Sequence, residues 1–176
     1  MFASDSRSAA FSTPNLNKPY RLWSLYLWDF ERSSEPRLVQ GSFLALTQCR
    51  GLASDGDKLV ALDTRGDIVT LDFATGRKIS SFHVERPTQR MAVLKASPDA
   101  SKLALTVNTP TGSAVSVLDS RSGKLLYSLP AENGTVYGLD WSPDSAHLAV
   151  SQDNGGVAIW DLETVNRILA QLGLSP

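Results

Sequence analysis

The sequence lacks the features that mark disulfide-stabilised, membrane-spanning or nucleic-acid-binding chains. Its only cysteine is Cys49, so no internal disulfide can form and the fold depends on packing. No apolar stretch approaches the roughly 20 residues that a membrane-spanning helix needs, and the first residues show no signal-peptide pattern. Lys and Arg number 17 against 18 Asp and Glu, which leaves no basic surplus for a phosphate backbone. We therefore expect a cytoplasmic protein with no nucleic-acid or membrane partner.

Patterns typical of catalysis and of cofactor binding are missing as well. The sequence contains no Gly-x-Ser-x-Gly, no Gly-x-Gly-x-x-Gly, no phosphate-binding Gly-Lys-Ser/Thr loop and no paired Cys or His at metal-ligand spacing. The two histidines, His83 and His147, have no candidate nucleophile near them in sequence. We expect no catalytic residue, no metal ion and no cofactor.

Two markers recur along the chain with similar spacing. The first is a turn-forming segment with Ser and Asp, whose aspartates are spaced 50, 44 and 45 residues apart: Asp5, Asp55, Asp99 and Asp144. The second is an apolar run that ends in a large apolar residue and Asp: Trp28 and Asp29, Leu71 and Asp72, Leu118 and Asp119, Trp160 and Asp161. The aspartates of the second marker are 43, 47 and 42 residues apart, so the two markers together indicate a structural repeat.

Short strands fill the space between these markers. Gly76 and Gly123 follow Thr or Ser in the second and third repeats, and glycine there suits a tight hairpin turn. Besides the apolar runs that end in Asp, strands are predicted at 58–63, 102–107, 147–151, 78–82 and 124–129. Several of these strands are apolar on both faces, which is typical of sheets packed between two other sheets. The recurrent aspartates themselves suit local hydrogen bonding within turns.

This pattern resembles the WD-repeat family of β-propellers. The fourth repeat carries the closest match, with Leu-Asp-Trp-Ser-Pro-Asp at 139–144 and Ile-Trp-Asp at 159–161. The chain departs from the family pattern in lacking the Gly-His dipeptide and in having Leu-Asp in the middle repeats. The resemblance implies an all-β fold of propeller blades, each an antiparallel four-stranded sheet, with repeats at about 1–50, 51–92, 93–135 and 136–162.

A ring of blades must close, because an open blade exposes apolar faces and strand edges to water. Since four repeats are present and most propellers of this family have more, we expect a partial propeller. Three arrangements stay open: the C-terminal half of a larger propeller, two copies that complete one ring, or four blades that close on themselves.

The sequence changes character after Asp161. Five apolar residues fall on one side of a helix predicted at 162–172: Leu162, Val165, Ile168, Leu169 and Leu172. Asp161 can cap the start of this helix and Gly173 can end it. Two interpretations stay open, a closing helix that covers the last blade and a helix that docks on a partner.

Function is expected to reside in the surface loops. Two segments look like insertions between strands, 13–23 and 108–113. Tyr20, Arg21 and Trp23 are of the residue types that anchor interfaces, which makes them candidates for partner contact. The resemblance implies a non-catalytic scaffold for a protein or peptide partner. The alternative is the propeller portion of an enzyme, such as a hydrolase or signalling kinase, for which carboxylates such as Asp67 or Asp140 would have to converge at the central channel.

Overall fold

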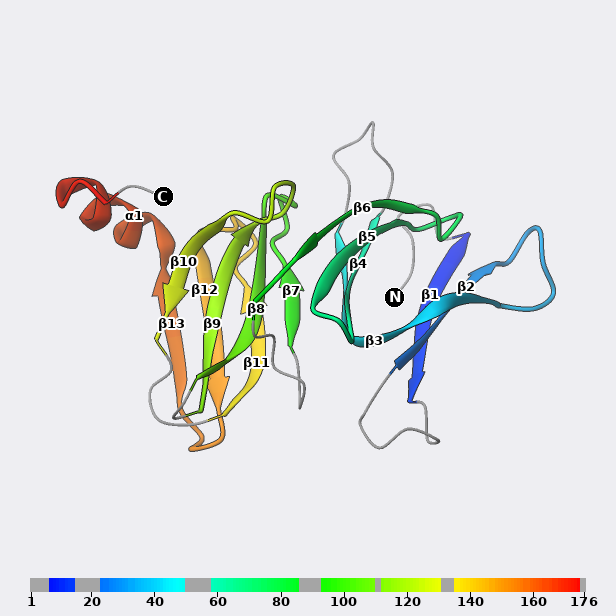
Figure 1. Ribbon diagram of the computed structural model, residues 1–176, viewed down its shortest axis with the longest axis horizontal. Coiled ribbons are helices and arrows are strands. Elements are labelled where there is room, and N and C mark those ends of the chain that lie inside the picture. Colours follow the sequence, from blue (N-terminus) through cyan, green and yellow to red (C-terminus); the bar gives the residue numbers. More distant parts are fainter. Residues whose placement is uncertain are drawn as a thin grey trace. The chain divides into compact units, whose positions relative to one another are not determined.

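The computed structural model describes residues 7–14, 23–49, 58–85, 93–109, 112–130 and 135–174. The chain divides into two compact units. The first unit comprises Met1–Glu85 and Gln89–Met91, and the second unit comprises Arg86–Thr88 and Ala92–Pro176. The paired strands run antiparallel to their neighbours in both units. Helix α1 (Leu162–Gln171) follows the last described strand (Figure 1).

The first unit contains six strands that pair in chain order: β1 (Ser8–Pro14), β2 (Trp23–Asp29), β3 (Arg37–Cys49), β4 (Lys58–Asp63), β5 (Asp67–Asp72) and β6 (Lys78–His83). Strand β3 is 13 residues long and belongs to two ladders. Its start pairs with β2 and its end pairs with β4, and Phe43 is in register with residues of both strands. The register shifts next to Phe43 in both ladders, so β3 joins two smaller sheets, β1–β3 and β3–β6.

These two sheets share one apolar core. Leu25 and Leu27 of β2 lie in the same cluster of buried side chains as Leu59 of β4 and Leu71 of β5. The turn between β5 and β6 also approaches the neighbouring sheet, since a Cβ added at Gly76 would lie 2.7 Å from Leu27 Cδ1. The two sheets therefore pack face to face, and β3 crosses from one to the other.

The second unit contains a four-stranded sheet and a three-stranded sheet. In spatial order the first comprises β10 (Leu125–Leu129), β9 (Gly112–Asp119), β8 (Lys102–Thr109) and β7 (Leu94–Ala96); the second comprises β11 (Val136–Trp141), β12 (His147–Gln152) and β13 (Val157–Asp161). Val117 and Leu129 of the larger sheet share a buried cluster with Leu139, Trp141 and Leu148 of the smaller one. These two sheets also pack face to face.

Burial differs between the inner and the outer strands of these sheets. Strands β4 and β9 are buried at nearly every position. Strand β6, the last strand of its ladder, is exposed at nearly every position. Strand β13 also lies at a sheet edge and alternates between exposed and half-buried residues.

The helix forms where the sequence predicted it. Asp161 caps α1, because its carboxylate accepts hydrogen bonds from the backbone N–H and the hydroxyl of Thr164. Gly173 ends the helix with φ +70°, and the Leu174 N–H donates back to the Leu169 carbonyl oxygen. The five apolar residues do not all face the last sheet, however. Leu162, Val165 and Leu169 pack on the core of the second unit, whereas Ile168 and Leu172 are exposed.

The predicted insertion at 108–113 is largely part of a hairpin instead of a loop. Asn108 pairs with Ser113 and Thr109 pairs with Gly112, so β8 and β9 continue to within two residues of each other. The apolar periodicity used to place strand ends stops earlier than the backbone ladder does. The other predicted insertion, 13–23, lies mostly outside the described residues.

Candidate functional site: repeated aspartate turns and open sheet faces

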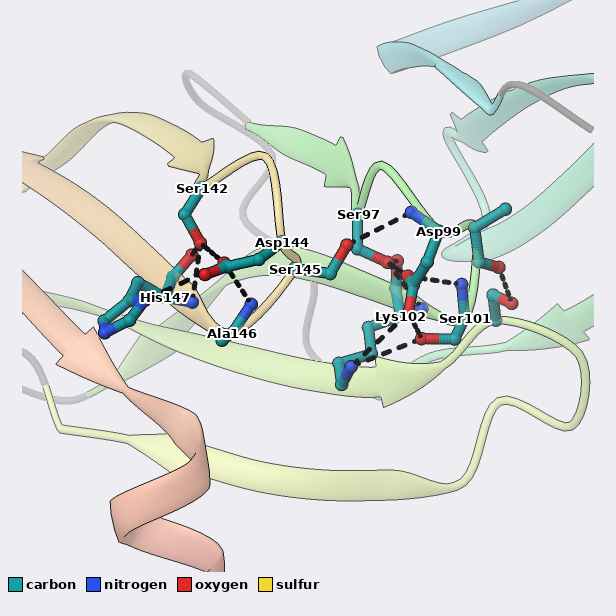
Figure 2. Close-up of polar contacts among 11 residues, drawn as sticks. Ser97, Asp99, Ser101, Lys102, Ser142, Asp144, Ser145, Ala146 and His147 are labelled. Atoms are coloured by element: carbon teal, nitrogen blue, oxygen red, sulfur yellow. Dashed lines mark hydrogen bonds and ion pairs between the residues drawn. The ribbon is translucent and has the colours of Figure 1, made fainter.

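A Ser-Pro-Asp turn joins β7 to β8 and is held by a closed set of hydrogen bonds (Figure 2). The Ser97 hydroxyl donates to Asp99 Oδ1 over 2.6 Å and accepts from the Lys102 N–H over 2.9 Å. The second oxygen of Asp99 accepts from the Ser101 hydroxyl over 2.8 Å, while Oδ1 also accepts from the Ser101 N–H over 3.0 Å. The turn satisfies its own polar groups and fixes where β8 begins.

The turn between β11 and β12 repeats this arrangement. The Ser142 hydroxyl donates to Asp144 Oδ1 over 2.5 Å and accepts from the His147 N–H over 2.8 Å. Asp144 Oδ1 also accepts from the Ala146 N–H over 3.0 Å. Equivalent residues therefore make equivalent bonds in two successive sheets.

The two turns are joined to each other within the second unit. The Asp99 N–H donates to the hydroxyl of Ser145, which is buried, over 3.1 Å. Ser145 and its counterpart Ala100 both have left-handed backbones, with φ +61° and +58°. Because non-glycine residues rarely adopt this conformation, its recurrence indicates that the bond network fixes the turn shape.

Hydrogen bonds set the acidity of these carboxyls. Burial acts to raise the pKa of Asp99, but the bonds from Ser97 and Ser101 outweigh it and hold the value at about 2. The Ser142 hydroxyl and the Ala146 N–H lower the pKa of Asp144. Both side chains are ionised acceptors at neutral pH and are occupied by their own turns.

The aspartates that end β2, β5, β9 and β13 form a second series of turns. Asp72 accepts from the N–H and hydroxyl of Thr75 over 2.7 and 2.5 Å, and Asp119 accepts from the same groups of Ser122 over 2.7 and 2.6 Å. These bonds lower the pKa of both aspartates. Asp161 uses the same pattern to start α1, and Asp29 accepts from the N–H groups of residues 31 and 32. The same hydrogen bonding by an Asp side chain thus occurs at the start of a hairpin turn and at the start of a helix.

The apolar residues beside these aspartates face opposite sides of their sheets. Leu71 and Trp160, each directly before Asp, pack against the preceding sheet of their own unit. Leu27 and Val117, each two residues before Asp, pack against the following sheet. Leu118 is buried, and Trp28 stacks edge-on against Phe30 with ring centroids 5.0 Å apart.

Sheet β11–β13 has one face that its own unit leaves open. Ile159 occupies the same repeat position as Val117, yet Ile159 is 72% exposed whereas Val117 is 0% exposed. Val157 and Tyr137 are also largely exposed. We call Tyr137, Val157 and Ile159 the open face.

The structure leaves several predicted positions without a description. Tyr20, Arg21, Asp5 and Asp55 lie outside the described residues. Trp23 begins β2, but its side chain is not among those described. The proposed contact role of the 13–23 segment therefore stays a prediction.

The charged residues considered for an enzyme site each contact other polar side chains. His83 Nδ1 lies 3.0 Å from Asp67 Oδ1, and Arg65 lies 3.6 Å from the other oxygen of Asp67. Asp140 Oδ1 pairs with Lys95 Nζ at 3.2 Å. Within the described ranges, no group of three or more His, Cys, Asp or Glu side chains could hold a metal ion.

A cleft in the first unit was not anticipated from the sequence. Its volume is about 760 Å³, and it lies between the start of β3 and strands β5 and β6. Val69 and Leu71 line it beside Arg37, Arg65 and Lys78. These cations come from three different segments of the chain, so no local pattern could have revealed them.

In the described part of the chain, no helix has the length and apolar character required to span a bilayer.

Sequence comparison finds no protein-family model and no curated protein that matches the chain. Structure comparison finds similarity to the C-terminal WD40 domain of Sif2, with a TM-score of 0.59 at 14% sequence identity. The alignment covers 91% of this chain and 41% of that chain, so the present chain spans about two-fifths of the solved structure. The repeated antiparallel sheets, the recurrent aspartate turns and this similarity together show that the chain has a WD40-like β-propeller fold.

Proposed function

We propose that the chain is a protein-interaction module, a segment of a WD-repeat propeller that binds protein partners and does not catalyse a reaction. The observation that carries the proposal is the open face of sheet β11–β13. Exposed apolar residues on one face of a sheet, next to an unpaired strand edge, are typical of surfaces that bind another protein.

The chemistry of the partner follows from the repeat. Val117, the counterpart of Ile159, is buried by a neighbouring sheet of the same kind. The open face presents the same residue type at the same repeat position, so its partner is a further propeller sheet with an apolar face. In this proposal that sheet comes from a second copy of the chain or from another part of a larger propeller.

The experiment compares two lysine substitutions of exposed isoleucines. Ile159→Lys places a charge on the open face, and Ile79→Lys makes the same change on β6, where Ile79 is 52% exposed. We expect the purified chain to self-associate in sedimentation velocity, because the open face otherwise stays in water. Ile159→Lys should weaken that association and remove cross-links to the face, whereas Ile79→Lys should leave both unchanged.

Two outcomes count against the proposal. A wild-type chain that stays monomeric at high concentration, and that cross-links to nothing through Tyr137 or Val157 when expressed in its parent cell, would contradict it. Equal loss of association in both isoleucine variants would also contradict it, because a general increase in charge would then explain the effect.

A further inference from the structure

The geometry points to the cleft of the first unit as a binding site for an extended peptide segment that carries an acidic residue followed by apolar residues. This inference rests on the proposed function and names a second surface, separate from the open face. Four features carry it: the size of the cleft, its apolar floor, a strand edge along its wall and the charge at one end.

Size and lining suit a short segment of polypeptide. The volume of about 760 Å³ falls within the range of roughly 300–1,000 Å³ typical of ligand sites. Phe43, Val69 and Leu71 form its buried apolar lining. A strand rises about 3.3 Å per residue, so the stretch of β5 between Val69 and Leu71 gives the floor a length of about 7 Å. Two or three extended residues would cover the floor, and the flanking residues of a five-residue peptide would extend toward its ends.

The wall of the cleft offers backbone hydrogen-bonding groups. Residues 37–39 of β3 pair with β2 on one edge, and the ladder with β4 begins only at Phe43. Within the described residues, the other edge of 37–39 has no strand partner, and Arg37, Leu38 and Val39 all line the cleft. An exposed strand edge beside an apolar floor is the arrangement to which extended peptides add as an extra strand.

Charge fixes which segment fits and how it is oriented. At one end Arg65 is already paired, since its guanidinium contacts Asp63 Oδ2 at 2.9 Å and Asp67 Oδ2 at 3.6 Å. At the other end Arg37 donates through Nη2 to the Thr75 carbonyl oxygen and retains further N–H groups. Lys78 lines the same end and has no ion-pair partner among the described residues. This end is therefore cationic and suits a carboxylate.

The chain provides a matched control for the charge. Arg77 and Lys78 are neighbours at the start of β6, but only Lys78 lines the cleft. Arg77 is not among the lining residues, so Lys78→Glu and Arg77→Glu make the same charge change inside and outside the site. Lys78 is exposed and thermal melts of both variants check that the fold survives.

The probes are two labelled peptides, Glu-Val-Ser-Leu-Ser and Lys-Val-Ser-Leu-Ser, with binding to the full chain followed by fluorescence anisotropy. We expect the acidic peptide to bind about tenfold more tightly than the basic one, and less tightly as salt is added. Lys78→Glu should weaken the acidic peptide by about tenfold and reverse the preference, and Arg77→Glu should change little.

Several outcomes would overturn the inference. Equal binding of the two peptides, or no effect of Lys78→Glu, would exclude a charge-selective cleft. Competition by inorganic phosphate as effective as that of the unlabelled acidic peptide would show a simple anion site. If neither peptide binds while Ile159→Lys still abolishes association, the cleft inference fails and the proposed function stands. If the peptides bind as expected but the open face has no partner, the reverse holds.

Discussion

Acid should weaken this protein partly through one carboxylate, Asp99. In the folded chain Asp99 accepts three hydrogen bonds from Ser97 and Ser101, and its pKa is about 2 instead of the ordinary 3.8. A carboxyl whose pKa is lowered by folding stabilises the folded state while it is ionised. That contribution is complete above about pH 4 and is lost as the pH falls through about 2.

The size of the effect follows from the pKa and the exposure. A change from 3.8 to about 2 corresponds to about 2.4 kcal/mol for a fully shielded group. The Asp99 side chain is 47% exposed, so solvent screening reduces the expected contribution to about 1 kcal/mol. Asp99→Asn keeps the shape of the side chain but removes its titration.

The assay is urea unfolding followed by tryptophan fluorescence, from about neutral pH down to about pH 2. The wild type should lose about 1 kcal/mol more of its free energy of unfolding over this range than Asp99→Asn does. Asp153→Asn is the control, because Asp153 is exposed and its side chain makes no hydrogen bond in the described structure. Parallel losses in the wild type and Asp99→Asn would refute the reasoning.

Four further substitutions test three other contacts, each by chemical denaturation. Ser145→Ala removes the hydroxyl that joins the two Ser-Pro-Asp turns and should cost about 1 kcal/mol, whereas an unchanged midpoint would show that the turns are independent. Gly76→Ala and Gly155→Ala both place a methyl group on a residue with positive φ, but only the one at Gly76 would meet another atom, Leu27 Cδ1 at 2.7 Å. Gly76→Ala should therefore lower the free energy of unfolding by at least about 1 kcal/mol more than Gly155→Ala does. Asp161→Ala should lose about 1 kcal/mol and part of the helical circular dichroism signal, and a signal equal to wild type would rule out the cap.

Local chemistry explains which elements could be predicted from the sequence. Strands β6 and β12 begin where predicted because each follows a turn whose Asp, Ser or Gly residues act within a few positions. The cap at Asp161 is equally local. Pairs such as Asp119 and Ser122 are only three residues apart, so the turn that they form can be predicted from their spacing in the sequence.

Features that depend on distant packing could not be predicted in the same way. The sequence gives no sign that Ile159 is exposed while Val117 is buried, because both are β-branched residues at the same repeat position. The cleft depends on Arg37 and Lys78, which are brought together only when two sheets pack. Likewise, Ile168 follows the helical period of the buried residues, yet it lies outside the core cluster and is exposed.

The shared strand β3 has a consequence for how the first unit loses its structure. The backbone of β3 is hydrogen-bonded to β2 near its start and to β4 near its end, so β3 is part of both small sheets. If β1 and β2 detach, the start of β3 loses its hydrogen bonds to β2. The loss of structure there then destabilises the end of β3, which pairs with β4. Amide protons in β2 and β4 should therefore exchange with solvent in the same opening event, which makes two adjacent blades a single cooperative unit.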